Sequence, residues 1–368
     1  MSNYKTMISL HSYNGTLGAA IGDVYGSYYE FQHGPKTPKH EIRIHESSCF
    51  TDDTVLTAAV ADYLKRKTSG ENVSPTQVVQ AWARKYADAG YGGYFRYHWL
   101  YNDDPKPYNS FGNGSAMRVS SVAYFANDLK EVEELATEVT AITHNHPEGI
   151  KGAVVIATAI FMAFNGASRE EIGNYASKRY DLNLDYDAMM KELGHGEEIC
   201  QVTVPQALWC FLHSDSFEDC LRLCLHLRFD ADTLAAIACP IAEAFYKEIP
   251  EEFILETKAR LPQDILAALE SVPKATKYCL EQGHSPSLEN YCLVFAAFPL
   301  GGKRENANGK SSANLAFYSA NLNVLRKKRR SGGMNSDHLS KRKTIAPVEP
   351  RQFRLSAISK GRNQSLPS

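Results

Sequence analysis

The sequence lacks the features of a secreted or membrane-spanning protein. Residues 1–14 show no charged segment followed by an apolar one, as a signal peptide would. The longest apolar run, Ala153–Phe164, is shorter than the roughly 20 residues that a membrane-spanning helix needs. The 8 cysteines contain no CxxC pair, which is typical of reduced thiols inside a cell. We therefore expect a cytoplasmic protein without a membrane partner, in which Ala153–Phe164 forms a buried core helix.

A zinc site is not indicated either. Cys220, Cys224 and His226 are close enough in sequence to form part of one. However, leucines alternate with them in the stretch FEDCLRLCLHLRF, and such apolar neighbours favour burial in a core. Core packing is therefore the prediction for these residues, and zinc binding is the alternative.

The chain also lacks a large net charge, but its charge is distributed unevenly. The formal net charge is −2, so nucleic acid is not an expected partner of the protein as a whole. Residues 301–368 hold 15 Lys and Arg against 3 Asp and Glu, a net of +12, which leaves −14 on residues 1–300. Few large apolar residues occur in this basic segment. We expect a folded domain at residues 1–300 and a disordered tail at 301–368, and only the tail could bind nucleic acid.

No convincing alternation of apolar and polar residues predicts a β-strand. Apolar residues instead recur at helical spacing, and several segments open with Ser, Thr or Asp followed by Pro or Glu in the first turn. The predicted fold class is all-α, a compact many-helix domain. Helical segments are expected within residues 55–67, 74–89, 129–143, 168–180, 204–227 and 262–282.

Glycines recur every four residues near the N-terminus. Gly18, Gly22 and Gly26 would form a smooth ridge along one face of a helix. Each interior glycine costs a helix roughly 1 kcal/mol relative to alanine. We therefore expect the close approach of another backbone or of a ligand to offset this cost.

Two acidic stretches stand directly before predicted helices. FTDDT, Phe50–Thr54, and FDADT, Phe229–Thr233, each place two carboxylates and a hydroxyl at a helix start. Capping of free amides would explain one such stretch, because carboxylates favour helix N-termini. Two of them in one domain favour a shared cation site, and oxygen ligands are typical of Mg²⁺, Mn²⁺ or Ca²⁺.

Two polar stretches lie between the acidic ones. In YNSFGNGSAMRV, Gly112 and Gly114 free the backbone just before a helix, where amides can bind phosphate oxygens. THNHPEGIKGA places His144 and His146 ahead of the apolar helix. Each stretch alone is more simply a turn with hydrogen-bonded polar residues. Together with the acidic stretches they favour a ligand-binding site.

The order of these motifs resembles that of the ADP-ribosylglycohydrolase family. The matching stretches, which span roughly residues 7–250, are GAAIGDVYGSYYEF, FTDDTVLTAAVADYL, NSFGNGSAMRVS, THNHPEGIKGA, VPQALW and DADTLAAIA. The resemblance implies an all-α hydrolase of the bond that joins ADP-ribose to a modified group, with two divalent cations, Mg²⁺ or Mn²⁺. We expect a monomer whose partner is ADP-ribose or an ADP-ribosylated protein or small molecule.

The resemblance also implies roles for particular residues. The metal ligands would be Thr51, Asp52, Asp53, Asp230, Asp232 and Thr233. The substrate would contact Gly112, Asn113, Gly114, Ser115 and His144. Glu30 matches a glutamate that stands near the substrate, and the candidates for catalytic proton transfer are Glu30, Asp53 and Asp232.

Three residues depart from the family pattern. Arg228 and Phe229 stand where the family usually has two glycines, which permit a positive φ and close approach. Pro240 lies inside the second predicted metal-ligand helix, which it should kink. We expect the replacement of both Arg228 and Phe229 by glycine to accelerate turnover. Two alternatives stay open: an impaired family member that binds ADP-ribose or is structural, and a two-metal hydrolase of another small nucleotide compound.

Overall fold

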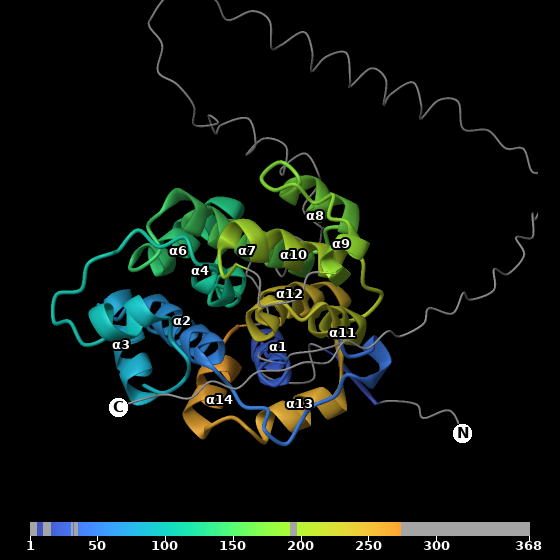
Figure 1. Ribbon diagram of the computed structural model, residues 1–368. Helices are drawn as coiled ribbons and strands as arrows, with labels where there is room; N and C mark the ends of the chain where they lie inside the picture. Colours follow the sequence, from blue (N-terminus) through green and yellow to red (C-terminus); the bar gives the residue numbers. More distant parts are fainter. Residues whose placement is uncertain (1–5, 10–15, 31, 33–35, 192–196, 274–368) are drawn as a thin grey trace, which may run out of the picture. The chain divides into compact units, whose positions relative to one another are not determined.

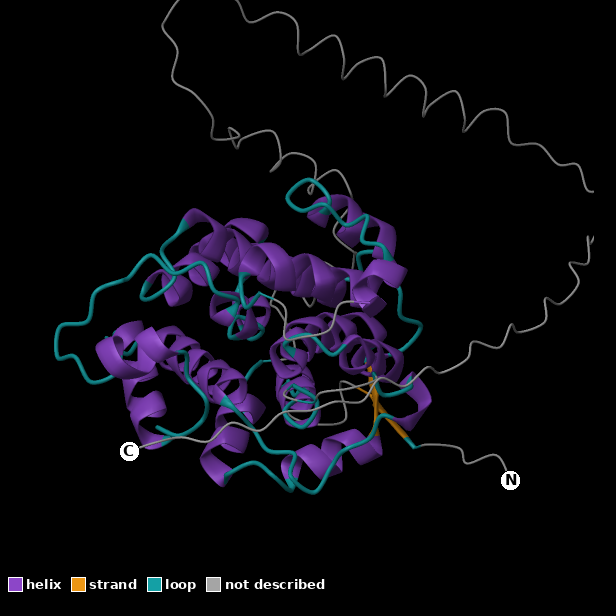
Figure 2. Cartoon of the chain, viewed as in Figure 1, coloured by secondary structure: helices purple, strands orange, loops and turns teal. Residues whose placement is uncertain are grey.

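The described residues of the computed structural model are 6–9, 16–30, 32, 36–191 and 197–273, and they are mostly helical, with loops between the helices (Figure 2). The predicted all-α class is confirmed. Two short strands, β1 (Met7–Ser9) and β2 (Glu248–Pro250), pair antiparallel with Ile8 opposite Ile249. The basic tail expected at residues 301–368 lies outside the described residues.

Helix α12 (Ala231–Tyr246) is the central element of the domain (Figure 1). Residues on all of its faces are buried, as is typical of a helix that is apolar on every side. The helix continues through Pro240, so this proline does not end it. Its neighbours are α1 (Gly18–Gly26), α7 (Pro147–Phe164), α10 (Cys200–Leu212) and α11 (Phe217–Leu227).

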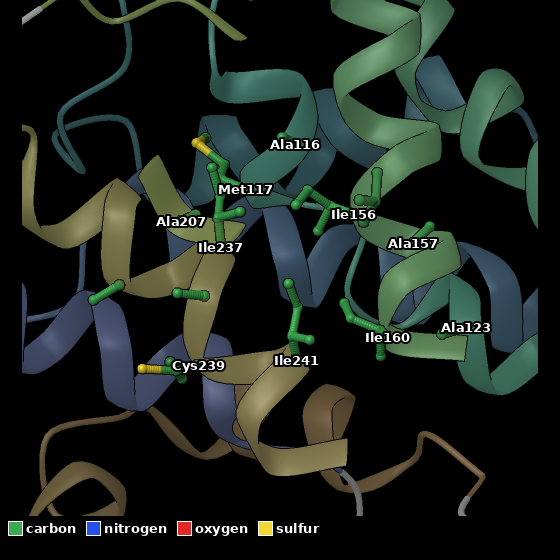
Figure 3. Close-up of a cluster of buried hydrophobic side chains, with 14 of the residues drawn as sticks. Ala116, Met117, Ala123, Ile156, Ala157, Ile160, Ala207, Ile237, Cys239 and Ile241 are labelled. Atoms are coloured by element: carbon green, nitrogen blue, oxygen red, sulfur yellow. The ribbon is translucent and has the colours of Figure 1, made fainter. Parts of the chain in front are cut away.

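Figure 3 shows the part of the core that lies between α12 and the helices above it. Ile237 and Ile241 of α12 meet Ile156 and Ile160 of α7, all of them at most 1% exposed. Met117 reaches the same cluster from α4 (Gly114–Met117). This core fixes the position of the first turn of α12, where the second acidic stretch lies.

The remaining helices surround this core. Helix α2 (Asp52–Thr68) packs against α1, α3 (Pro75–Lys85), α5 (Val122–Phe125) and α14 (Gln263–Glu270). Helix α7 also packs against α6 (Leu129–Ala141) and α8 (Arg169–Ala176). The other elements are α9 (Tyr186–Lys191), α13 (Glu251–Lys258), a 3₁₀ turn at Lys39–Glu41 and a π-helical turn at Phe95–Trp99.

Capping residues set several of the helix starts that the sequence predicts. Thr51 accepts a hydrogen bond from the amide of Asp53 at the start of α2, and Ser168 forms a capping box with Glu171 in α8. The segment 204–227 was expected to be helical throughout, but the structure divides it into α10 and α11. Ser216 caps α11 by accepting from the amide of Asp219 at 3.0 Å, so the chain turns before this residue.

Helix α7 is the buried apolar helix that the sequence predicts at Ala153–Phe164. By length and composition alone it could cross a membrane, with a mean hydropathy of 1.5 over 18 residues. However, 67% of that window is buried against the rest of the domain. Its packing against α4, α6, α8, α10 and α12 identifies it as a core helix.

The cysteines of α11 lie in the core, as predicted. Cys220 and Cys224 are fully buried, and His226 hydrogen-bonds through its ring to the carbonyl oxygen of Thr37 and to the hydroxyl of Tyr186. The groups of described residues that could hold a metal ion contain only carboxylates. Zinc binding by this part of α11 therefore has no support among the described residues.

Candidate active site

A pocket of about 560 Å³ lies where the ends of several elements meet. The first turns of α2 and α12 form part of its wall, the turn that follows α1 contributes Ser27 and Glu30, and the glycine loop before α4 forms a further part. The predicted site residues that line it are Glu30, Thr51, Asp52, Asp53, Gly112, Asn113, Gly114, His144, Asp230, Asp232 and Thr233. The structure thus brings together residues from both ends of the domain.

Ser115 is the predicted site residue that does not line the pocket. Its side chain is fully buried, and its Oγ donates to the carbonyl oxygen of Gly112 at 3.2 Å and contacts Sγ of Cys200 at 3.0 Å. The expected substrate contact by Ser115 stays a prediction, and its buried side chain does not support it. The serine faces inward because the first turn of α4 directs it toward α10, and its role is to fasten the glycine loop.

One group of carboxylates joins the first turns of α2 and α12 with α1. Oxygen atoms of Asp23, Asp53 and Asp232 lie within 4.8 Å of one another, and all three residues are buried. The hydroxyls of Thr51 and Thr233 donate to Oδ2 of Asp53 at 3.2 and 3.3 Å. The other oxygen of Asp53, Oδ1, is buried without a hydrogen-bond partner among the described residues. A buried oxygen of this kind fits a cation, because an unpaired buried charge is otherwise costly.

A second group shares Asp232 with the first. Oxygen atoms of Glu30, Asp230 and Asp232 also lie within 4.8 Å of one another. The side-chain amide of Asn113 donates to Oδ2 of Asp230 and to Oγ1 of Thr203, which ties the glycine loop to α10 and α12. Asp52 belongs to neither group, although it lines the same pocket. The two groups are oxygen-only donor sets, which suit hard divalent cations.

Asp23 is a site residue that the sequence motifs did not identify. It is fully buried in α1, and its carboxylate accepts from the amide and hydroxyl of Thr51 at 2.8 Å each. It also accepts from the amide of Thr54 at 3.1 Å and from its hydroxyl. These bonds hold the first turn of α2 against α1. The signal in the sequence was a single acidic residue on the glycine-rich helix.

Arg118 and His144 also line the pocket. Arg118 is 1% exposed and donates through Nε to the carbonyl oxygen of Gly114 and through Nη1 to the hydroxyl of Thr143 at 3.4 Å. The hydroxyl of Thr143 also hydrogen-bonds to Nδ1 of His144 at 2.7 Å. Burial, with the Arg118 charge as a smaller cause, holds the pKa of His144 well below its usual range. The imidazole therefore faces the pocket as a neutral group. No sequence motif identified the buried Arg118.

Four carboxyls of the site, those of Glu30, Asp52, Asp53 and Asp232, have raised pKa values in the absence of a cation. Burial is the largest cause for each of them, and neighbouring carboxylates are the next. The pKa of Asp52 rises from 3.8 to about 7 through burial and the charge of Asp23, and that of Glu30 rises from 4.5 to about 8 through burial and the charge of Asp230. The pKa values of Asp53 and Asp232 lie well above their usual range for the same reasons.

The stability of the metal-free protein should therefore depend on pH. A carboxyl whose pKa is higher in the folded than in the unfolded state stabilises the fold at low pH, and this contribution is lost as pH rises through the folded-state pKa. With chelator, we expect the free energy of unfolding to fall between about pH 4 and about pH 8, the range set by Asp52 and Glu30. Added Mg²⁺ should reduce this fall, because a cation offsets the repulsion. Urea denaturation across this range measures both, and a chelated protein whose stability rises with pH would contradict the assignment.

Comparisons with known proteins agree with this arrangement. The family model described as ADP-ribosylglycohydrolase matches residues 12–280. The chain is 26% identical over 337 residues to bovine ADP-ribosylhydrolase ARH3, covering 70% of this chain and 92% of the relative. It is also 26% identical over 271 residues to ADP-ribosylarginine hydrolase Tri1 of Pseudomonas putida, covering 65% and 71%.

Two further comparisons concern a third relative and a solved structure. The chain is 24% identical over 272 residues to the ADP-ribosyl-[dinitrogen reductase] glycohydrolase of Rhodospirillum rubrum, covering 68% of this chain and 90% of the relative. A solved structure titled ADP-ribosylglycohydrolase-related protein complex superposes with a TM-score of 0.53 at 23% identity. It covers 70% of this chain and 94% of that one, which supports the same helical fold.

Proposed function

Because the chain belongs to the ADP-ribosylglycohydrolase family, we propose that it hydrolyses the glycosidic bond between ADP-ribose and an acceptor. The observation that carries the proposal is the pocket itself. Glu30, Asp53, Asp230 and Asp232 line it together with the loop Gly112–Gly114, whose Asn113 donates to Asp230. An acidic cluster beside a backbone loop suits a substrate that has both sugar hydroxyls and a diphosphate.

The proposal includes two divalent cations, Mg²⁺ or Mn²⁺, one for each group of carboxylates. Asp53 and Asp232, with the hydroxyl oxygens of Thr51 and Thr233 close by, would hold one. Asp230 and Asp232 would hold the other. When bound, such cations supply Lewis-acid chemistry that orients sugar hydroxyls and lowers the pKa of water.

The side chains around these groups would bind and orient the substrate. The amides and glycines of residues 112–114, beside neutral His144, would contact the diphosphate and ribose. The bond to the acceptor breaks with positive charge developing on the ribose, which the surrounding carboxylates stabilise. Glu30 is half-buried at the pocket edge and would move a proton between water and the leaving group, with Asp53 and Asp232 as the other candidates.

A panel of substrates tests this function. Peptides ADP-ribosylated on arginine or on serine, ADP-ribosylated nucleic acid and O-acetyl-ADP-ribose would each be incubated with the full chain and Mg²⁺ or Mn²⁺. Metal-dependent release of ADP-ribose from at least one of them is the expected result. Binding of ADP-ribose without release from any would support the impaired alternative, and release of a different product from another nucleotide would support the third.

Replacing Glu30 by glutamine should lower turnover roughly 100-fold or more while leaving metal binding in place, because general acid–base groups contribute at least that much. The amide keeps the size of the side chain but cannot transfer the proton. Initial rates give the effect, and the melting temperature with and without Mg²⁺ checks that the site still binds metal. Glu46→Gln, at an exposed position outside the pocket, is the control. A Glu30→Gln variant with wild-type turnover would assign proton transfer to Asp53 or Asp232.

The cellular setting is part of the same proposal. We place the protein in the cytoplasm as a monomer, because the described cysteines are free thiols, which reducing compartments maintain. Size-exclusion chromatography with light scattering tests the oligomeric state. Imaging of the tagged full chain tests the location.

A further inference from the structure

The end of α11 holds an arginine in a left-handed backbone conformation. Arg228 has φ 51° and ψ 48° directly after the last residue of the helix. Glycine adopts this conformation without strain, whereas a side chain disfavours it. Among the described residues, the other non-glycine residues with positive φ are Asn109 and Lys247. The contacts of the Arg228 side chain must therefore offset a strained backbone.

The guanidinium group of Arg228 makes contacts that reach toward Glu30. The residue is 7% exposed, and its Nη2 donates to Oγ1 of Thr37 at 3.0 Å. Its Nη1 donates to the carbonyl oxygen of Gln32 at 3.5 Å. Gln32 follows Glu30 by two positions, and Arg228 precedes Asp230 by two positions. One side chain thus connects the backbone beyond Glu30 with the backbone that leads into Asp230.

Other residues of α11 hold the same stretch of chain. The ring of His226 donates through Nδ1 to the carbonyl oxygen of Thr37 at 2.7 Å. Arg222 donates through Nη1 to the carbonyl oxygens of Lys39, at 3.3 Å, and of Ile42. The helix therefore binds this stretch at several points along its length, and the bonds of Arg228 join the residues that are nearest in sequence to Glu30 and Asp230.

Phe229, unlike Arg228, packs into the hydrophobic core. Its ring is 1% exposed in the core, and Nζ of Lys36 lies 4.9 Å from the ring centroid. It does not line the pocket. The expectation that glycine at both Arg228 and Phe229 would accelerate turnover is therefore revised. Phe229→Gly would leave a cavity under Lys36 and destabilise the domain.

We propose that Arg228 is a positioning residue that fixes Glu30 relative to Asp230 and Asp232. The inference rests on the proposed function, in which these three residues act on one substrate. Glycine at position 228 would relieve the backbone strain but could not make the bonds to Thr37 and Gln32. The hydrogen bonds of the Arg228 side chain offset the strain in its backbone. They also hold the proton-transfer group at a fixed distance from the metal ligands.

Three substitutions at position 228 separate positioning from stability. Arg228→Ala and Arg228→Gly both remove the guanidinium, but only glycine also removes the strain. We expect kcat to fall about tenfold in both, with KM changed less than threefold, since misplaced groups slow the chemical step. The glycine variant should melt roughly 2–4 °C higher than the alanine variant. Arg228→Lys should recover part of the loss, because the ammonium can still donate to Thr37.

The control is Arg169→Ala, which removes a similar pair of bonds elsewhere. Arg169 donates to the hydroxyl of Tyr246 at 2.8 Å and to the carbonyl oxygen of Leu212 at 3.4 Å, and it does not line the pocket. We expect its kcat to stay within twofold of wild type. Thr37→Val should reproduce part of the Arg228→Ala loss and add nothing to it in the double variant.

Three outcomes would overturn the proposal. These are an Arg228→Gly variant with wild-type or higher kcat, a kcat that follows melting temperature across all variants, and an Arg169→Ala variant as slow as Arg228→Ala. In the first of them, a higher kcat would identify Arg228 as an obstacle to turnover, and an unchanged kcat would show that it does not position the site. The second and third would reduce its role to stability.

Amide hydrogen exchange tests the contact between α11 and residues 36–42 without any measurement of turnover. Exchange in the peptide that covers residues 36–42 should be faster in Arg228→Ala and Arg228→Gly than in wild type or Arg169→Ala. Unchanged exchange would show that Arg228 does not hold residues 36–42 against α11. If wild type releases no ADP-ribose but exchange responds as expected, the proposed function fails and the tie between α11 and residues 36–42 stands.

Discussion

Replacing Asp52 and Asp232 together by alanine is expected to abolish both the release of ADP-ribose and the stabilisation of the protein by Mg²⁺ or Mn²⁺. Asp232 belongs to both groups of carboxylates, and Asp52 lines the same pocket. Loss of the bound cations should remove several kcal/mol of transition-state stabilisation, on the order of 1000-fold in rate. Wild type should gain about 2.7 kcal/mol of stability at a cation concentration 100 times its Kd, and the double variant should gain none.

Without a bound cation, the double variant should be at least as stable as wild type, whereas with the cation wild type should be the more stable of the two. Burial and neighbouring charges disfavour the ionised forms of Asp52 and Asp232, so removing both carboxylates relieves repulsion. The chelated double variant should therefore melt no lower than chelated wild type at pH 8, although it is inactive. Thermal denaturation with chelator and with Mg²⁺ measures both effects on the same samples.

Asp103→Ala with Asp104→Ala is the matched control for this experiment. Both residues are exposed, neither lines the pocket, and the double substitution changes the net charge by the same amount. Its activity and metal response should equal those of wild type. An Asp52→Ala, Asp232→Ala variant that keeps the full metal-dependent shift would refute the metal assignment.

The metal-ligand candidates could be predicted from the sequence because they occupy helix starts. Asp52 and Asp53, like Asp230 and Asp232, follow a recognisable pattern of carboxylates and a hydroxyl before an apolar helix. Their chemistry favoured a shared cation site, and the family resemblance added which residues would be the ligands. Helical periodicity predicts which face of a helix is buried but not which distant helix covers it.

Asp23, Arg118 and Ser115 show where this reasoning reached its limit. Asp23 lies within a helix, where no capping pattern marks it, and only the fold shows that its partners are Thr51 and Thr54. Arginine side chains usually lie on the surface of a protein, yet Arg118 is only 1% exposed. Ser115 belongs to the motif of the glycine loop, but the turn of α4 directs its side chain inward.

For Arg228 the sequence predicted the backbone strain but not the contacts of the side chain. The sequence predicted correctly that a residue in place of the family's glycine would be strained, and the left-handed backbone confirms it. The sequence did not identify the partners of the Arg228 side chain, and the structure shows that the guanidinium donates to Thr37 and Gln32. Backbone strain follows from local sequence, whereas the partner that offsets it is a property of the tertiary structure.

The glycine ridge of α1 provides the second large prediction. A Cβ atom at Gly26 would lie 2.3 Å from Cα of Asp232, and one at Gly22 would lie 2.4 Å from backbone atoms of Ala235. The expected close approach of another backbone is thus confirmed, and α12 is the element that approaches. Since these neighbours are backbone atoms, no change of rotamer can make room for a methyl group.

Gly26→Ala should therefore push α1 away from the first turn of α12. We expect a loss of stability of about 3 kcal/mol, the upper end for overpacking, because α1 and α12 are both central. The displacement would also separate Asp23 and Glu30 from Asp232, so turnover should fall on the order of 100-fold. Urea denaturation, initial rates and the Mg²⁺-dependent shift in melting temperature measure the three effects.

Gly173→Ala in α8 is the matched control, because intrinsic helix propensity favours alanine at both positions. A Cβ atom at Gly173 would meet only side-chain atoms of Leu212, at 3.4 and 3.7 Å, which is ordinary contact. This variant should gain up to about 1 kcal/mol of stability and keep wild-type turnover. If Gly26→Ala also gains stability and keeps its metal response, then the contact between α1 and α12 does not set the geometry of the site. If Gly26→Ala lowers the stability of the protein and Gly173→Ala raises it, then backbone contact, and not helix propensity, accounts for the glycine beside Asp232.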